Sequence, residues 1–339
     1  MMAATSLVAD DQTTAKESPL FADNELLELT ITAPFTNMMR ERSADEEAAA
    51  TLSYRDVVDG EVVLDVGIRT RGRFRKQKDI CTFTPLRINF KKGATKGTLF
   101  KKIDKVKLVT HCRDGSRRYS QSVLREYLAY RILNTMTDDS FRVRLLHVTY
   151  IDTNPKKRQR EDFAFFIEPD DRLEKRLGLK VQDVPKTTIS SLDGAHTNLV
   201  SVFQYLIGNT DFSPIKAPEG EPCCHNHVLL GTRNDSMLSI PYDFDMSGFV
   251  DAPHSAPNPR FRLRNVRIRL YRGRCMNNAR LATTLQAYTD RKADIYTLLS
   301  GLTQLSDQTR RKVRRYIDDF YATIENSKRV NARLEEKCI

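Results

Sequence analysis

Residues 61–69 read EVVLDVGIR, residues 83–90 read FTPLRINF and residues 105–111 read KVKLVTH. All three runs are short and rich in β-branched or large apolar residues, which is typical of β-strands. A Lys- and Gly-rich segment at residues 91–97 separates the second run from the third and is typical of a turn. An alternating apolar and polar run at residues 26–33 comes before them. The pattern predicts a β-meander near the start of the chain.

The meander is followed by a predicted helix at residues 120–136. Its apolar residues recur at helical spacing, and Ser120 or Ser122 can cap its start. Two more strand-like runs follow at residues 143–152 and 162–168. The stretch at 40–53, by contrast, is polar and rich in Ala and Glu, and it predicts no strand.

From residue 170 onward the pattern becomes mainly helical. Two short strand-like pieces, HVLLG and MLSIPYDF, interrupt it, and a Pro- and Arg-rich segment at 251–275 is typical of an extended loop. Amphipathic helices are predicted over residues 277–334. We therefore expect an α+β protein with a flexible segment at 1–24, a β-rich lobe carrying one helix at 25–168, and a mainly helical lobe at 169–339.

The composition restricts the class of protein and the kind of partner. The 339 residues are 40% hydrophobic, which is enough for a sizeable core, and no run of about 18 apolar residues could span a bilayer. The net charge of +11 favours anionic partners in general, but the basic residues are spread over the whole chain. An ordinary solvated basic surface is therefore favoured over a dedicated nucleic-acid interface.

The six cysteines do not have the spacing of a structural zinc site. If the protein is exported, disulfides between Cys81 and Cys112, or between Cys275 and either Cys223 or Cys224, are expected. The polar first 24 residues contain no signal peptide, so they fit either a cytoplasmic protein or one whose export signal has been removed. The cysteines and this N-terminus suggest a periplasmic or exported protein, and a cytoplasmic one is the alternative.

Three polar clusters lie where predicted helices or strands begin or end. They are IGNTDFS at 207–213, CCHN at 223–226 and PYDFDMSG at 241–248. Together they supply Asp211, Asn226 and the pair Asp243 and Asp245. Phosphoryl transfer needs an Asp to orient the acceptor hydroxyl, and an Asn and an Asp as oxygen ligands for magnesium. Because successive side chains of a strand point to opposite faces, we expect only one of the two last Asp residues to bind metal.

This order of residues resembles that of the CotH-type atypical kinases and, more distantly, HipA-type proteins. The resemblance spans roughly residues 60–250 and implies a bilobal protein-kinase-like fold. It implies that Asp211, in the loop Gly208-Asn209-Thr210-Asp211, is the catalytic residue. It also implies that Asn226 and the element Tyr242-Asp243-Phe244-Asp245 bind Mg²⁺ or Mn²⁺.

The resemblance also extends to the β-rich half. Arg69-Thr70-Arg71-Gly72 matches an R-x-R-G turn, Glu126 takes the place of the helical Glu that pairs with a phosphate-binding Lys, and Glu168 lies near the adenine. Asn89 stands where that Lys is expected. The substitutes for it are Arg87, Lys91 or Lys107, and Arg71 of the R-x-R-G turn is also expected to bind the nucleotide.

The sequence also departs from the family pattern. The usual His after the catalytic Asp is missing, since Phe212 and Ser213 follow Asp211, and the segment from Asp211 to Asn226 is long and contains three prolines. From the resemblance as a whole we expect ATP-dependent phosphoryl transfer to a protein hydroxyl. The departures favour the alternative that follows. One alternative is a pseudokinase-type scaffold that binds nucleotide without turnover. A nucleic-acid-binding protein ranks last, because no aromatic and basic residues alternate as they do on a single-strand binding surface.

Simpler interpretations of single residues stay open. Asp211 can cap a turn, and Glu126 can be a solvated charge on a helix. His225 and His227 are expected to be structural or surface residues. The arginines of residues 69–75 either face one anion together or lie along a solvated strand edge. The arginines of residues 261–274 either bind an acidic substrate or pair with acidic residues of the same chain.

Overall fold

The computed structural model describes residues 18–221, 223–232 and 235–339. The predicted flexible segment falls mostly on residues 1–17, which lie outside the described residues. Just after them, a 3₁₀ helix at Pro19–Phe21 places Leu20 and Phe21 among the buried apolar residues of the first half of the chain.

Seven strands of the first half form one closed barrel, in the order β1-β2-β3-β4-β5-β7-β6. Their bounds are β1 (Leu27–Ala33), β2 (Ala48–Asp56), β3 (Gly60–Thr70), β4 (Leu86–Phe90), β5 (Lys105–Val109), β6 (Val143–Asp152) and β7 (Arg160–Ile167). Strands β1 to β5 form the predicted antiparallel meander.

The barrel closes because β1 pairs with strands on both of its sides. It is antiparallel to β2 and parallel to β6, with a register that runs from Leu27 opposite Leu146 to Ala33 opposite Asp152. Alternate residues of β1 are buried, as expected for a strand with one face toward a core. Ile31 and its apolar counterparts on the other strands fill the interior.

The prediction of a bilobal protein-kinase-like fold is therefore wrong. The structure is an α+β fold with a closed, mixed barrel of seven strands and a separate sheet of three strands. Most of the barrel strands were correctly predicted from their apolar pattern. The pattern says nothing about the pairing of β1 with β6, whose residues are more than 100 positions apart and whose contact closes the barrel. In addition, β2 lies largely within the Ala- and Glu-rich stretch for which no strand was expected.

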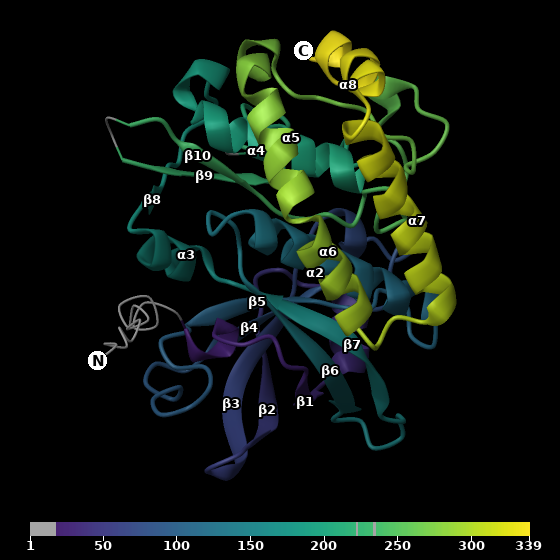
Figure 1. The fold of residues 1–339 in the computed structure, drawn as a ribbon. Helices are drawn as coiled ribbons and strands as arrows, with labels where there is room; N and C mark the ends of the chain where they lie inside the picture. Colours follow the sequence, from purple (N-terminus) through teal and green to yellow (C-terminus); the bar gives the residue numbers. More distant parts are fainter. Residues whose placement is uncertain (1–17, 222, 233–234) are drawn as a thin grey trace, which may run out of the picture.

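The described residues contain eight α-helices, and most of them belong to the second half of the chain (Figure 1). Their bounds are α1 (Phe35–Glu41), α2 (Arg117–Met136), α3 (Asp170–Leu177), α4 (Gly194–Ile207), α5 (Leu281–Asp290), α6 (Lys292–Gly301), α7 (Asp307–Ile324) and α8 (Ser327–Arg333). The small sheet has the order β10-β9-β8, formed by β8 (Lys180–Val181), β9 (His227–Gly231) and β10 (Leu238–Pro241).

Helix α2 connects the two halves of the molecule. Figure 1 shows it between the barrel and the helices of the second half. Its buried residues, among them Tyr130, belong to one large apolar cluster together with residues of β6, β7 and α4 to α7. This cluster takes residues from both sides of position 168, so the barrel is held firmly against the helical half.

All six cysteines are paired in the structure. The expected Cys81–Cys112 disulfide is present. The expected link from Cys275 to Cys223 or Cys224 is wrong, because Cys223 bonds to Cys224 and Cys275 bonds to Cys338. The chain end lies against residues 273–275 through two backbone hydrogen bonds, which brings Cys338 to Cys275. No helix in the described part of the chain is long and apolar enough to cross a membrane.

Candidate functional site

A cavity of about 550 Å³ lies at one end of the barrel, where the barrel meets the second half of the chain. The barrel side of its wall consists of the loop that follows β3, together with Pro85, Val109 and Ile167 at the ends of β4, β5 and β7. The opposite wall contains the polar residues predicted as a site: Asp211, Asn226, Asp243 and Asp245. These residues come from three separate segments, which the fold brings together.

Asp211 follows the apolar helix α4, whose C-cap is Gly208. Gly208 has a left-handed backbone (φ 61°), and a Cβ at this position would overlap the hydroxyl of Tyr316, so only glycine fits this turn. Asn209 then accepts the backbone N–H of Asp211 at 2.9 Å. The Asp211 carboxylate is hydrogen-bonded to His225 Nε2 at 3.0 Å. This bond raises the pKa of His225, so His225 is not a simple surface residue.

Asn226 lies directly before β9 and also has a left-handed backbone (φ 55°). Its amide Nδ2 donates to the backbone oxygen of Asp211 at 2.7 Å and to Asp211 Oδ2 at 3.3 Å. Its own backbone oxygen accepts the N–H of Tyr242 at 3.0 Å. Because both amide hydrogens are turned toward Asp211, the side-chain oxygen Oδ1 is the atom left to receive a ligand. No hydrogen bond from the described residues reaches it.

Asp243 follows β10 and is a third position with a left-handed backbone (φ 62°). Its backbone N–H donates to the buried hydroxyl of Tyr130 at 2.8 Å, which fixes the turn against helix α2. Its carboxylate has no hydrogen-bond donor among the described residues. Burial and the neighbouring charge of Asp245 raise the pKa of Asp243 to about 6.

Asp245 is buried and differs from Asp243 in having a direct partner. Its Oδ2 lies 2.9 Å from Nε2 of His254. Burial raises the pKa of Asp245, but the hydrogen bond and charge of His254 outweigh this effect and leave the pKa below its ordinary value. Of the two Asp residues, Asp243 therefore has the carboxylate that is more available to a ligand, because the carboxylate of Asp245 is hydrogen-bonded to His254.

Glu126 of α2 is buried beside this pair of aspartates. Burial and the charges of Asp245 and Asp243 raise its pKa well above the ordinary value, while the charge of Arg75 and the backbone N–H of Phe244 act in the opposite direction. Glu126 is thus neither a solvated helix charge nor a lining residue of the cavity. It adds a third acidic group behind the two aspartates.

Three arginines of the loop after β3 supply positive charge to the cavity. Arg71, Arg73 and Arg75 line it, while Arg69 lies within β3 and pairs with Glu47 outside it. Arg75 is buried and donates to the backbone oxygen of Thr110. Its charge opposes the effect of burial on the pKa of Asp243 and Asp245, although the pKa of Asp243 stays raised. The charge of Arg75 acts on Glu126, whereas the expected substitutes for a Lys, Arg87, Lys91 and Lys107, are not part of the cavity wall. The sequence carried a signal for this, the alternating arginines, but no indication of which one turns inward.

Three other predicted residues lie outside the cavity wall. Arg87 and Lys107 are cross-strand neighbours on the barrel, and Lys107 Nζ lies 3.3 Å from Asp170. Burial lowers the pKa of both side chains. Lys107 Nζ also lies 5.4 Å from the centre of the Tyr242 ring, so it is next to a wall residue of the cavity. Lys91 lies at the far end of β4 and pairs with Asp65.

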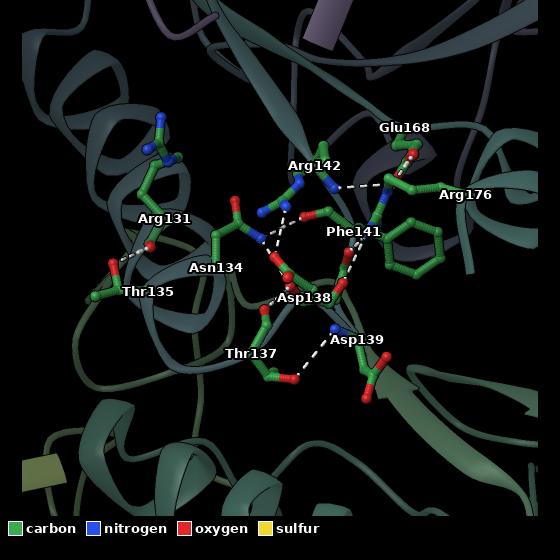
Figure 2. Close-up of polar contacts among 11 residues, drawn as sticks. Arg131, Asn134, Thr135, Thr137, Asp138, Asp139, Phe141, Arg142, Glu168 and Arg176 are labelled. Carbon is green, nitrogen blue, oxygen red and sulfur yellow. Dashed lines mark hydrogen bonds and ion pairs between the residues drawn. The ribbon is translucent and has the colours of Figure 1, made fainter. Parts of the chain in front are cut away.

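Glu168 is buried and engaged in a network at the end of β7. Both of its oxygens accept from Arg176, at 3.0 and 2.8 Å, and Oε2 also accepts the backbone N–H of Arg142 at 3.1 Å. Figure 2 shows Glu168 and Arg176 facing each other, with Asp138 beside Arg142. The carboxylate is therefore occupied by protein groups, and Ile167 is the residue of this pair that reaches the cavity.

The donor atoms of the cavity fit a hard divalent cation. Asp243 offers a carboxylate without a donor, Asn226 offers an amide oxygen, and both are the oxygen ligands that Mg²⁺ and Mn²⁺ prefer. Within the described residues, the group of Cys, His and acidic side chains that has metal-ligand spacing is Cys81, Cys112 and His254. Because its two sulfurs are bonded to each other, it offers no thiolates.

Comparison with known proteins adds no family assignment. No family model matches this chain, and no curated protein matches it. The geometry of the cavity therefore carries the functional argument.

Proposed function

We propose that the cavity binds ATP with Mg²⁺ or Mn²⁺ and that the protein transfers the terminal phosphoryl group to a protein hydroxyl. The proposal keeps the resemblance to CotH-type kinases at the level of the site residues alone. The observation that carries it is the Asp243 carboxylate, which is desolvated, has no hydrogen-bond donor among the described residues, and lines one cavity with Asn226 and Asp211.

The side chains have distinct roles in this proposal. Asp243 and the Oδ1 atom of Asn226 would hold the metal, which neutralises charge on the phosphates. Asp245, already held by His254, would contribute at most one further oxygen. Asp211 would orient the acceptor hydroxyl, and its hydrogen bonds to His225 and Asn226 keep its carboxylate in place.

The opposite wall supports the same ligand. Arg71 and Arg75 line the cavity, and the guanidinium fork of an arginine suits phosphate oxygens. Val109, Ile167 and Tyr242 add apolar surface that suits a nucleobase. A nucleotide placed in this way would have its base toward the barrel ends and its phosphates between the arginines and Asp243.

A nucleotide-binding scaffold without turnover is the second candidate. The observation that favours it is that an arginine, Arg75, and not a lysine lies near Glu126 and the metal-site aspartates. Arginine binds phosphate oxygens well, so this exchange affects the chemical step more than binding. Transfer of labelled phosphate to a protein, abolished by Asp211→Asn, would exclude the scaffold.

The first experiment is a thermal-shift titration with ATP and Mg²⁺ or Mn²⁺. We expect the wild type to melt several degrees higher when both are present, because a ligand that binds only the folded state stabilises it. Asp243→Ala and Asn226→Ala should abolish the increase. Asp183→Ala, which removes an exposed carboxylate outside the cavity, is the matched control and should retain it.

The outcomes separate the candidates. A wild type that shows no shift at saturating nucleotide and metal contradicts the proposal. A shift that survives in both Asp243→Ala and Asn226→Ala would place the nucleotide elsewhere. A shift without any phosphate transfer favours the scaffold.

We also propose that the protein works in an oxidising compartment, as an exported or periplasmic protein. Three cysteine pairs at disulfide distance support this, because such bonds persist mainly outside the reducing cytosol. A cytoplasmic protein would hold the same residues as thiols.

A further inference from the structure

The loop between β10 and α5 carries an unusual concentration of unpaired arginines. In the described part of the chain, no ion pair involves Arg260, Arg262, Arg264, Arg267 or Arg274, whereas Arg269 of the same loop pairs with Asp319. Unpaired charges on a protein that also carries 44 acidic residues are available to an outside partner.

Arg272 fixes this loop next to Asp211. Its Nη1 donates to the backbone oxygens of Thr210 and Phe212, at 3.0 and 2.7 Å, which are the residues on either side of Asp211. Its guanidinium also stacks on the rings of Phe212 and Phe261, 4.4 and 4.7 Å from their centres. The loop therefore cannot move away from Asp211 without breaking these contacts.

Two unpaired arginines lie close to this anchor. The charges of Arg274 and Arg260 both act on Arg272, as does the charge of Asp211. Arg260 is exposed, and Arg274 is half-buried. We call Arg260, Arg272 and Arg274 the basic rim. It places positive charge beside the carboxylate that would receive the acceptor hydroxyl.

We infer that the basic rim binds an acidic protein segment, and that under the proposed function this segment carries the acceptor hydroxyl. The inference rests on the proposed function for that second part only. A carboxylate-rich segment fits because guanidinium forks pair with carboxylates in two-point contacts. Nucleic acid fits less well, because Phe212 is buried and Arg272 lies between it and Phe261, so neither ring offers a free face between them for a base to stack on.

The test measures binding of fluorescent peptides by anisotropy, without nucleotide. One peptide has a serine flanked by Glu and Asp, and a second of equal length has the same serine flanked by Gln and Asn. We expect the acidic peptide to bind about tenfold tighter, and Arg260→Glu/Arg274→Glu to lose about that factor. Added salt should weaken the binding of the acidic peptide and leave the binding of the neutral peptide unchanged.

Matched variants keep the result interpretable. Lys92→Glu/Lys96→Glu makes the same charge change on exposed residues at the opposite end of the barrel and should leave binding unchanged. Arg260→Gln alters one exposed side chain of the rim, so it reports on the rim even if the Arg274 variant does not fold. This variant should bind the acidic peptide severalfold more weakly than the wild type does.

Three results would overturn the inference: equal binding of both peptides, equal loss in the lysine control, or a single-stranded DNA that binds as tightly and responds to the same variants. Its failure is distinguishable from that of the proposed function. The nucleotide shift is measured separately on the same proteins, and a wild type that binds the acidic peptide without any nucleotide shift would refute phosphoryl transfer while the rim stands as a docking surface.

Discussion

The Asp243 carboxylate is held in the cavity by its backbone rather than by its side chain. The left-handed turn and the Tyr130 hydroxyl fix its position, and burial beside Asp245 makes its charge unfavourable. A divalent cation would relieve this cost, since it supplies the missing positive charge. A bound divalent cation would therefore stabilise the charged form of Asp243, which burial and the charge of Asp245 disfavour.

The raised pKa of Asp243 predicts that the stability of the protein depends on pH even without substrate. The folded-state pKa of about 6 lies above the unfolded value, so the carboxyl group stabilises the fold when protonated, and this contribution is lost as pH rises through about 6. Without metal, Asp243→Asn should therefore raise the melting temperature at pH 8 by roughly 2–4 °C. At pH 4, where wild-type Asp243 is protonated, the two proteins should melt alike.

Melting curves of both proteins from pH 4 to pH 8 check this. Asp183→Asn, on the surface, should show no such trend. The affinity for Mn²⁺ should rise through the same pH window, because a protonated carboxyl group does not bind metal. An Asp243→Asn protein that is less stable than the wild type at pH 8 would contradict the interpretation.

At the scale of elements, the end of β7 and helix α3 are joined by Glu168 and Arg176. Both side chains are buried, and Glu168 also accepts a backbone N–H from the segment before β6. The pair therefore ties the barrel to the first helix of the second half, next to Ile167 in the cavity wall. The pair therefore has a structural role in this fold, and the adenine contact that the resemblance implied for Glu168 stays a prediction.

Removing one partner of this pair should be costly. We expect Glu168→Ala to lower the free energy of unfolding by about 3–5 kcal/mol, because it removes a buried carboxylate that accepts hydrogen bonds from Arg176 and from the Arg142 backbone. Urea denaturation checks this. At temperatures where the variant is folded, the shift produced by ATP and metal should persist. A variant of wild-type stability that no longer binds nucleotide would instead support a direct contact with the base.

At the scale of the whole molecule, two of the three disulfides link segments that are far apart in the sequence. Cys81–Cys112 links the segment after β3, which carries Arg71, Arg73 and Arg75, to the segment after β5. Cys275–Cys338 links the chain end to the loop that carries the basic rim. The first of them joins two segments that contribute Arg75 and Val109 to the cavity wall. Its loss should therefore affect both stability and the site.

We expect protein from its native source to contain no free thiols. Alkylation under denaturing, non-reducing conditions followed by mass spectrometry should find all six cysteines unmodified. Replacing Cys81 and Cys112 with Ala should cost about 3 kcal/mol of stability, because the bond closes a loop of 31 positions in the unfolded chain. Six alkylated cysteines would remove the support for an oxidising compartment.

Local pattern was sufficient to predict most of the elements and the chemical type of the site residues. Alternation identified the strands because a half-buried strand has a period of two. Polar residues at element ends, such as Asp211 and Asn226, were recognisable because nothing in their apolar surroundings explains them. Strand β2 was missed since its alanines are too small to give a clear apolar signal.

The tertiary structure decided what pattern could not express. Closure of the barrel depends on β1 meeting β6, a contact between residues more than 100 positions apart, and a period of two says nothing about which strand is the neighbour. The inward turn of Arg75, the occupation of Glu168 by Arg176 and the partner of each cysteine follow from that arrangement. Residue types and their order specify which groups are present, and only the folded chain determines which of them share a cavity, because proximity there comes from packing and not from spacing along the sequence.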